Sequence, residues 1–160
     1  MAKLTQDLQA TWWEWLSMSE RLLTALHRQT VALTLRKVEK IEEIQVDLDD
    51  LMDKMQELDD KAAALARGLA EELGVEPSLR SLVNVLEKAE AQQVQALANR
   101  VVVVGRNLQA VIDKNQALIA SELDFINGTA AILVREAQAQ TPGYGPAKSN
   151  SRSLAMDQAA

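Results

Sequence analysis

The sequence predicts an all-α protein, an elongated antiparallel bundle of three to four long helices with a flexible C-terminal tail. Apolar residues recur at alternating steps of three and four along most of the chain, and this spacing gathers side chains on one face of a helix. The 160 residues include 6 glycines and 3 prolines, too few to punctuate a barrel or sandwich of many short strands. With 48% hydrophobic and 25% charged residues, the composition is that of a folded domain.

Two apolar series fill the first half of the chain. The first spans residues 4–33, and the second, which is more regular, spans residues 41–69. Four heptads of alternating three- and four-residue steps are typical of a helix buried along a seam. We expect the second helix to end at Gly74, because a helix C-terminus often needs the left-handed conformation that glycine adopts. Residues 30–34 are poor helix formers and predict a break near residues 28–31 between the two series.

A third apolar series spans residues 94–132 and predicts a last helix from residue 78 to residue 140. A proline and a glycine directly after it stop this helix. Four consecutive valines before Gly105 form a second weak point, at which the chain would fold back to give four helices instead of three. We therefore expect one helical bundle domain at residues 1–140 and a flexible tail at residues 141–160.

The composition argues against several classes of partner and location. A chain with a formal net charge of −6 is poorly suited to displace the counterions of nucleic-acid phosphates, so no nucleic-acid partner is expected. Uninterrupted aliphatic runs, such as residues 101–104, are far short of the ~20 residues that span a bilayer, so no membrane insertion is expected. The first residues lack the apolar run of a secretory leader, and we expect a cytoplasmic location.

Catalysis and metal binding are not expected either. The chain has no cysteine and a single histidine, His27, which is interpreted as a surface or helix-end residue. One histidine cannot supply the paired Glu-x-x-His ligands of a di-iron bundle, and no Gly-rich phosphate loop or catalytic triad can be assembled. Residues 47–53 hold the carboxylates of a calcium loop, but the sixth position is Met52 where the loop requires glycine. The chain is therefore predicted to be a non-enzyme without cofactor or metal.

Two features leave alternatives open. Residues 39–60 hold ten acids and two bases, which we interpret as the solvated face of a helix, with a docking patch for a basic partner as the alternative. Trp12, Trp13 and Trp15 cannot all sit in one narrow seam, because adjacent helical positions point about 100° apart. They indicate a wide core face near one end of the bundle. Alternatively, Trp13 forms a second apolar stripe, with Leu16 and Leu23, for a partner or another copy.

The third series contains an irregularity. Its heptad column becomes polar at Asn115, and the apolar residues move to two neighbouring columns, Ile112-Ile119-Ile126-Leu133 and Val111-Leu118-Phe125-Ile132. Such drift is expected of a 3.6-residue helix against a 3.5-residue repeat, and it makes the face two columns wide. This width predicts either burial against two neighbouring helices or an exposed groove for the helix of another protein. A lone Asn115 in the seam would fix the register at some cost in stability.

The pattern Asn-x-x-Leu-Ile, formed by Asn115, Leu118 and Ile119, resembles the FlgN family of flagellar export chaperones. Three further features agree: Tyr144-Gly145 after the Pro/Gly stop, the acidic second helix, and a Gly-x-x-Pro-Ser joint before the third series. The likeness extends over roughly residues 4–154. One departure is that Pro146 and the residues after it stand where family members tend to show a second glycine.

The resemblance implies a cytoplasmic chaperone of the type III flagellar export system. Such a chaperone would bind the C-terminal helical region of hook–filament junction (hook-associated) proteins, prevent their premature assembly and deliver them to the export gate. The motif match places Asn115, Leu118 and Ile119 on the client-binding surface, and Tyr144 at the contact with the gate. The apolar columns add three further binding candidates: Phe125, Ile126 and Leu133.

Two alternatives to this function stay open. The first is a self-associating coiled-coil scaffold or tethering protein without a secretion client, in which the same apolar faces close a homodimer. Weak homodimerisation is also compatible with a chaperone. The second is another secretion chaperone that shares the mechanism and differs in its client.

Overall fold

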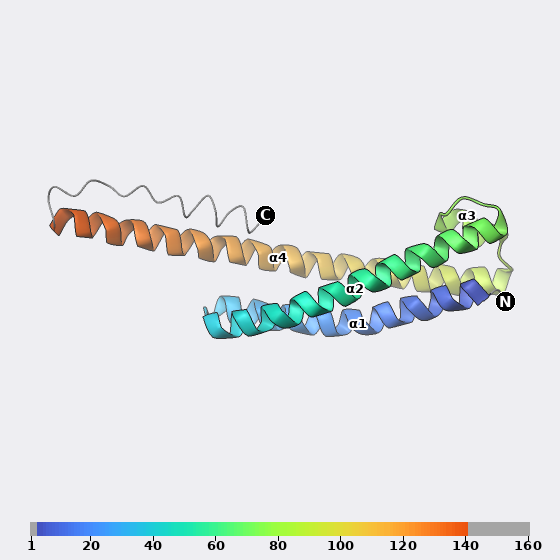
Figure 1. Ribbon diagram of the computed structural model, residues 1–160, viewed down its shortest axis with the longest axis horizontal. Helices are drawn as coiled ribbons and strands as arrows, with labels where there is room; N and C mark the ends of the chain where they lie inside the picture. Colours follow the sequence, from blue (N-terminus) through green and yellow to red (C-terminus); the bar gives the residue numbers. More distant parts are fainter. Residues whose placement is uncertain (1–2, 141–160) are drawn as a thin grey trace.

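The computed structural model describes residues 3–140, which form four helices. They are α1 (Lys3–Thr34), α2 (Val38–Leu73), the short α3 (Leu79–Val85) and α4 (Lys88–Gln140). The three long helices run in alternating directions, so that α2 is antiparallel to both α1 and α4 (Figure 1). The protein is thus an all-α, elongated antiparallel bundle, as the sequence predicts.

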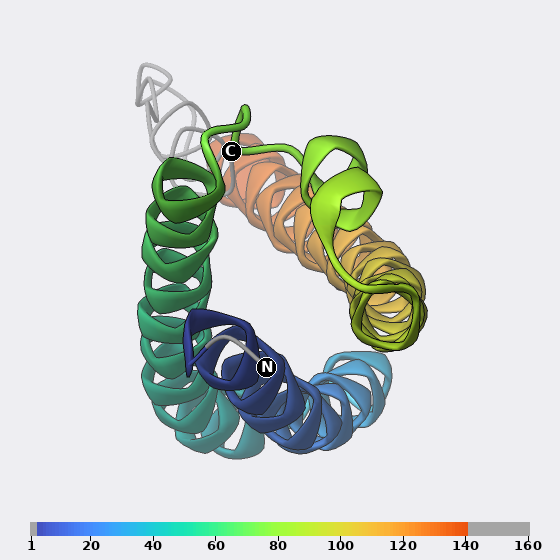
Figure 2. The same ribbon diagram turned by 90° about the vertical axis from the view of Figure 1, so that its right-hand side faces the viewer.

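Helix α1 is the centre of the bundle, and α2 and α4 lie on either side of it (Figure 2). The larger core cluster joins all three long helices, with Trp15 and Leu22 from α1, Ile44 and Leu48 from α2, and Leu108 from α4. A smaller cluster closes the end near α3, where Leu8, Leu69, Ala70 and Leu82 are buried together. Because α4 packs on α1 and α3, its position along the bundle is set mainly by α1.

The turn between α1 and α2 lies at residues 35–37, later than the break predicted near residues 28–31. Thr30 and Thr34 stay helical: the Thr34 hydroxyl donates to the Thr30 carbonyl oxygen at 2.8 Å, and the Thr30 hydroxyl lies 3.0 Å from the Leu26 carbonyl oxygen. Thr30 also contacts α4, which holds this last part of α1 against the bundle. The chain turns at Arg36, whose φ of 54° is in the left-handed region.

The other helix ends were predicted in part. Gly74 ends α2 with a φ of 68°, and its N–H and that of Val75 bond back to the last turn, as predicted for this glycine. The expected single helix from residue 78 to residue 140 is wrong: Ser78 caps the short α3, and the extended backbone of Leu86 separates it from α4.

The alternative break near Gly105 does not occur, because α4 passes through this residue without interruption. A Cβ at Gly105 would lie 3.8 Å from the ring of Trp15, so the glycine lies against a buried aromatic side chain. Contacts with α1 compensate for the low helix propensity of the valines beside it. The fourth helix is therefore α3, which packs Leu82 into the smaller core cluster.

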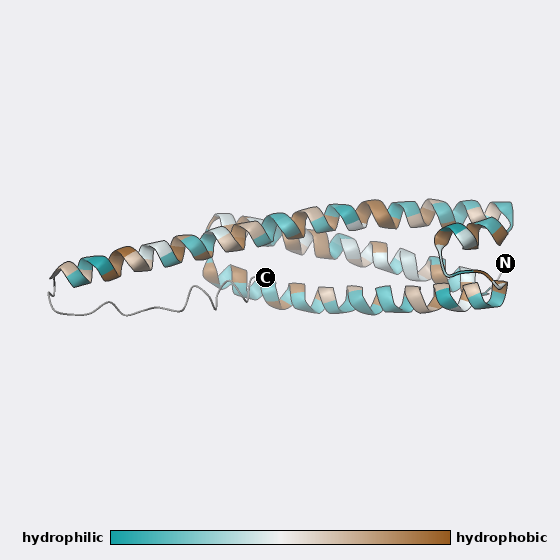
Figure 3. Ribbon diagram, turned by 90° about the horizontal axis from the view of Figure 1, so that it is seen from above, coloured by the Kyte–Doolittle hydropathy of each residue, from teal (hydrophilic) through white to brown (hydrophobic). Residues whose placement is uncertain are grey.

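Helix α4 is longer than its neighbours. At about 1.5 Å per residue, its 53 residues extend about 80 Å, whereas the 32 residues of α1 extend about 48 Å. Since α4 starts near the α3 end of the bundle, its C-terminal part runs past the α1–α2 turn (Figures 1 and 3). We call residues 123–139 the projecting part of α4.

Candidate protein-binding face

A polar network fixes α4 along α1 just before the projecting part begins. Asn115 is 1% exposed, and its Nδ2 donates to the Leu26 carbonyl and to Gln29 Oε1, both at 2.9 Å. The hydroxyl of Thr30 donates to Asn115 Oδ1 at 2.6 Å. A buried amide with this many partners tolerates only one register between two helices, because any shift leaves polar atoms unpaired. Asn115 therefore positions α4 and offers no surface to a binding partner in this state.

The bundle ends at a contact between Arg36 and α4. The Nε of Arg36 lies 3.0 Å from Glu122 Oε1, and its guanidinium carbon lies 4.0 Å from the centre of the Phe125 ring. Both interactions are partly solvated and contribute up to about 1 kcal/mol each. They determine where α4 leaves the bundle. Sequence reasoning missed Arg36, although a polar Glu122 in the seam column was a signal that an opposite charge would face it.

The predicted binding residues divide into two groups along α4. Leu118 and Ile119 are half-buried against the end of the bundle, whereas Phe125, Ile126 and Leu133 are 52%, 57% and 60% exposed. In the part of the chain that the structure describes, no other helix lies beside α4 beyond Phe125. The structure therefore places these five side chains along one helix, and Asn115 apart from them inside the bundle.

The projecting part exposes an apolar stripe about 100° wide. The two columns contribute Phe125 and Ile132 on one side and Ile126 and Leu133 on the other, all exposed by more than half. The polar column that holds Asn115 continues between them at Thr129, which is also exposed. The ribbon of this part of α4 is coloured brown, for apolar residues, in several of its turns in Figure 3. Neighbouring exposed apolar side chains that no described helix covers form a candidate binding surface.

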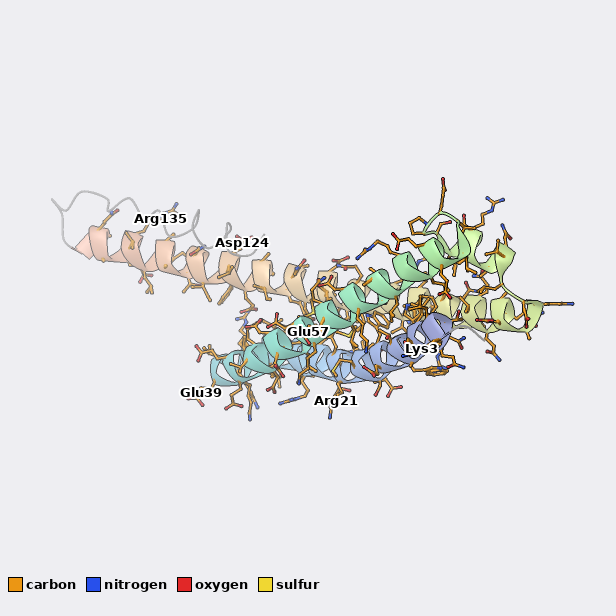
Figure 4. The ribbon with its side chains drawn as sticks, turned by 45° about the vertical axis from the view of Figure 1, so that its right-hand side comes forward. Lys3, Arg21, Glu39, Glu57, Asp124 and Arg135 are labelled. Atoms are coloured by element: carbon orange, nitrogen blue, oxygen red, sulfur yellow. The ribbon has the colours of Figure 1, made fainter. Side chains whose placement is uncertain are left out.

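Helix α4 also has the length and composition of a membrane span. In the stretch Lys88–Ala139, a window of 18 residues has a mean hydropathy of 1.5 and none of it is buried. Glu122 and Asp124 lie within the apolar part of this helix, and Figure 4 shows Asp124 and Arg135 on it. A carboxylate near the middle of a bilayer costs about 3 kcal/mol on insertion scales. Two carboxylates so close together argue against insertion of this helix into a bilayer. They favour a protein partner instead, because the carboxylates can then stay in contact with water.

The acidic residues of α2 lie on its outer surface. All ten acids between residues 39 and 60 are exposed, and Figure 4 shows Glu39 pointing away from the bundle. Asp59 differs from the others, because partial burial raises its pKa and the negative charge of Asp60 raises it further, whereas an interaction with the Trp15 side chain lowers it. Within residues 3–140, no group of three or more potential ligands is arranged to hold a metal ion.

The three tryptophans have different environments. Trp15 is buried and Trp12 half-buried, as expected of a wide core face. Trp13 is 52% exposed and lies under the guanidinium of Arg100 at 5.2 Å. The alternative stripe is not formed, because Leu16 is buried in the core. His27 is exposed, as predicted. Tyr144, the predicted contact with the export gate, and the predicted tail lie outside the described residues.

Fold and site together define an elongated helical bundle whose longest helix carries an uncovered apolar face. The chain belongs to the FlgN family: the family model described as FlgN protein matches residues 1–152. The search for relatives gave no match among curated proteins and none among solved structures. FlgN proteins are flagellar export chaperones that bind hook-associated proteins, and they are typically soluble and cytoplasmic. It is a chaperone family, without known enzymatic activity.

Proposed function

We propose that this protein is a cytoplasmic export chaperone that covers the C-terminal helical region of a hook–filament junction protein with the projecting part of α4. Covering this region prevents premature assembly and keeps the client ready for delivery to the export gate. The observation that carries the proposal is the exposure of Phe125, at the last contact of α4 with the bundle, and of Ile126 and Leu133 beyond it. An amphipathic client helix would bury these side chains together with its own apolar face.

The expected affinity follows from the exposed apolar area. The four large side chains of the stripe are between 52% and 60% exposed, so burying the exposed part of each yields about 1 kcal/mol. An equal contribution from the client brings the total to about 8 kcal/mol. Association and ordering of the interface offset several kcal/mol of this. The net binding free energy of about 4–6 kcal/mol corresponds to a dissociation constant between millimolar and micromolar, weak enough for release at the gate.

Replacing Ile126 by Asp tests this site. A carboxylate within the stripe must lose its hydration on binding, so we expect Ile126→Asp to weaken binding of a hook-associated protein's C-terminal segment at least tenfold. Ala131→Asp adds the same charge on the opposite, exposed side of the same helix and should change the affinity less than twofold. Isothermal titration measures both, and circular dichroism should show unchanged helicity. Wild-type affinity in Ile126→Asp would contradict the proposal.

Delivery to the gate has a separate test. The family resemblance supports a role for Tyr144 at the gate, so Tyr144→Ala should impair export without reducing client capture. Pull-downs with the client and with the cytoplasmic part of the gate distinguish the two steps. If Tyr144→Ala binds the gate normally, this assignment is wrong.

Analytical sedimentation distinguishes the chaperone hypothesis from the alternative of a self-associating scaffold. The free chaperone should be mainly monomeric and form a one-to-one complex with the client. A tight homodimer that buries Ile126 and Leu133 would instead support a self-associating scaffold.

A further inference from the structure

A second uncovered groove lies between α1 and α2, next to the turn that joins them. It has a volume of about 560 Å³. Its apolar floor consists of Val31, Leu35 and Ile44, and the first two are each 58% exposed. The groove exists because the chain turns at Arg36: α1 carries Val31 and Leu35 on one side, four residues apart, and α2 begins too close to the turn to cover them.

The rim of this groove is basic. Arg28, Lys37 and Lys40 line it together with His27, and none of its lining residues is acidic, although the chain as a whole carries a net charge of −6. Ion pairs within the protein neutralise the cations of the rim only weakly. Arg28 lies 3.8 Å from Asp47 and Lys40 lies 3.3 Å from Glu43, and all four side chains are more than half exposed. Such pairs contribute little and exchange readily for other carboxylates.

The groove faces away from the client-binding face. At about 100° per residue, Val31 and Leu35 point about 100–180° from Leu26, Gln29 and Thr30, the α1 residues that contact Asn115. A partner in the groove would therefore lie on the opposite side of α1 from α4. Both sites are at the same end of the bundle and can be occupied at the same time.

We propose that this groove is a second docking site, which binds an acidic amphipathic helix of another protein. The argument is charge complementarity around an apolar floor: carboxylates on the partner would meet the three cations, and two or three of its aliphatic side chains would cover Val31 and Leu35. The lining stretch of α1, from residue 24 to residue 35, is about 17 Å long and matches about three turns of a partner helix.

Two synthetic helical peptides of 16 residues test this site on the full chain. Both carry leucines at i, i+3, i+4 and i+7, one flanked by Glu and the other by Lys. In fluorescence anisotropy, we expect the Glu peptide to bind at least tenfold more tightly than the Lys peptide, and more weakly as salt is raised. Equal binding of the two peptides, or of a Glu peptide with scrambled leucines, would overturn the proposal. So would binding to phosphatidylglycerol vesicles with no binding of the Glu peptide.

Variants locate the site and separate it from the proposed client face. Lys37→Glu together with Lys40→Glu should reverse the peptide preference, and Leu35→Ser should weaken binding at least fivefold. All three side chains are exposed, so the fold should persist. Ile126→Asp is the matched control and should leave peptide binding unchanged. If Ile126→Asp removes binding while the rim variants do not, the groove assignment is wrong. The inference stands independently of the proposed client, because it concerns the opposite side of α1.

Discussion

Replacement of Asn115 by Ala should destabilise the protein substantially, although the position is polar. The change removes three hydrogen bonds that join α4 to α1 inside the bundle. At about 1 kcal/mol each, their loss costs about 3 kcal/mol. The hydroxyl of Thr30 can return to the Leu26 carbonyl, 3.0 Å away, which recovers part of this. We expect a decrease in the free energy of unfolding of about 2–3 kcal/mol.

Urea denaturation followed by circular dichroism measures this change. For a chain of 160 residues, a loss of 2–3 kcal/mol also lowers the melting temperature by about 6–9 °C. Gln116→Ala is the matched control, because the neighbouring side chain is exposed and makes no contact with α1; it should change stability by less than about 0.5 kcal/mol. If Asn115→Ala is as stable as the control, the amide network does not hold α4 in register.

Three further changes test other parts of the structure. Gly74→Ala places a side chain at a φ of 68° and should cost about 1 kcal/mol in urea denaturation, whereas Gly128→Ala, in open space within α4, should stabilise; equal effects would contradict the role of the left-handed turn. Arg36→Gly relieves a φ of 54° but loses both contacts with α4. Its stability should therefore change by less than about 1 kcal/mol, while distances between spin labels on α2 and the projecting part of α4 should broaden; an unchanged distance distribution would count against the contact. Burial raises the pKa of Asp59, so the folded chain binds its proton more tightly than the unfolded chain does, and stability rises as the pH falls through the folded pKa. Asp59→Asn should thus be more stable than the wild type at pH 7 and lose this advantage below the unfolded pKa of about 4, which unfolding at both pH values would show.

The periodicity of the apolar residues was sufficient to predict the long helices, because it reflects which side of each helix is buried. It also placed the end of α2 at Gly74 correctly, since the left-handed turn there has a local cause. The break near residues 28–31 was misplaced for the opposite reason. The low helix propensity of Thr30 is a local property, but its hydrogen bond to Asn115 joins residues 85 positions apart. Single-sequence reasoning cannot weigh such a contact against propensity.

The same distinction holds for the candidate site. Apolar columns along the last series predicted which residues would share a face, and the structure exposes Phe125, Ile126 and Leu133 on it. The position of Asn115 inside the bundle depends on how far α4 runs alongside α1. Likewise, Arg36 matters only because the turn brings it to Glu122. These are properties of packing between distant segments, and the sequence pattern of one helix does not contain them.

Hydrogen exchange on the full chain, with and without a hook-associated client segment, tests the central claim most directly. The projecting part of α4 has no described helix beside it, so residues 123–139 should exchange faster than the rest of α4 in the free protein. Client binding should then slow exchange across these residues and leave the acidic face of α2, residues 39–60, unchanged. If residues 123–139 are as protected in the free chain as the bundle core, or if a bound client leaves their exchange unchanged, the projecting part of α4 is not the client-binding face.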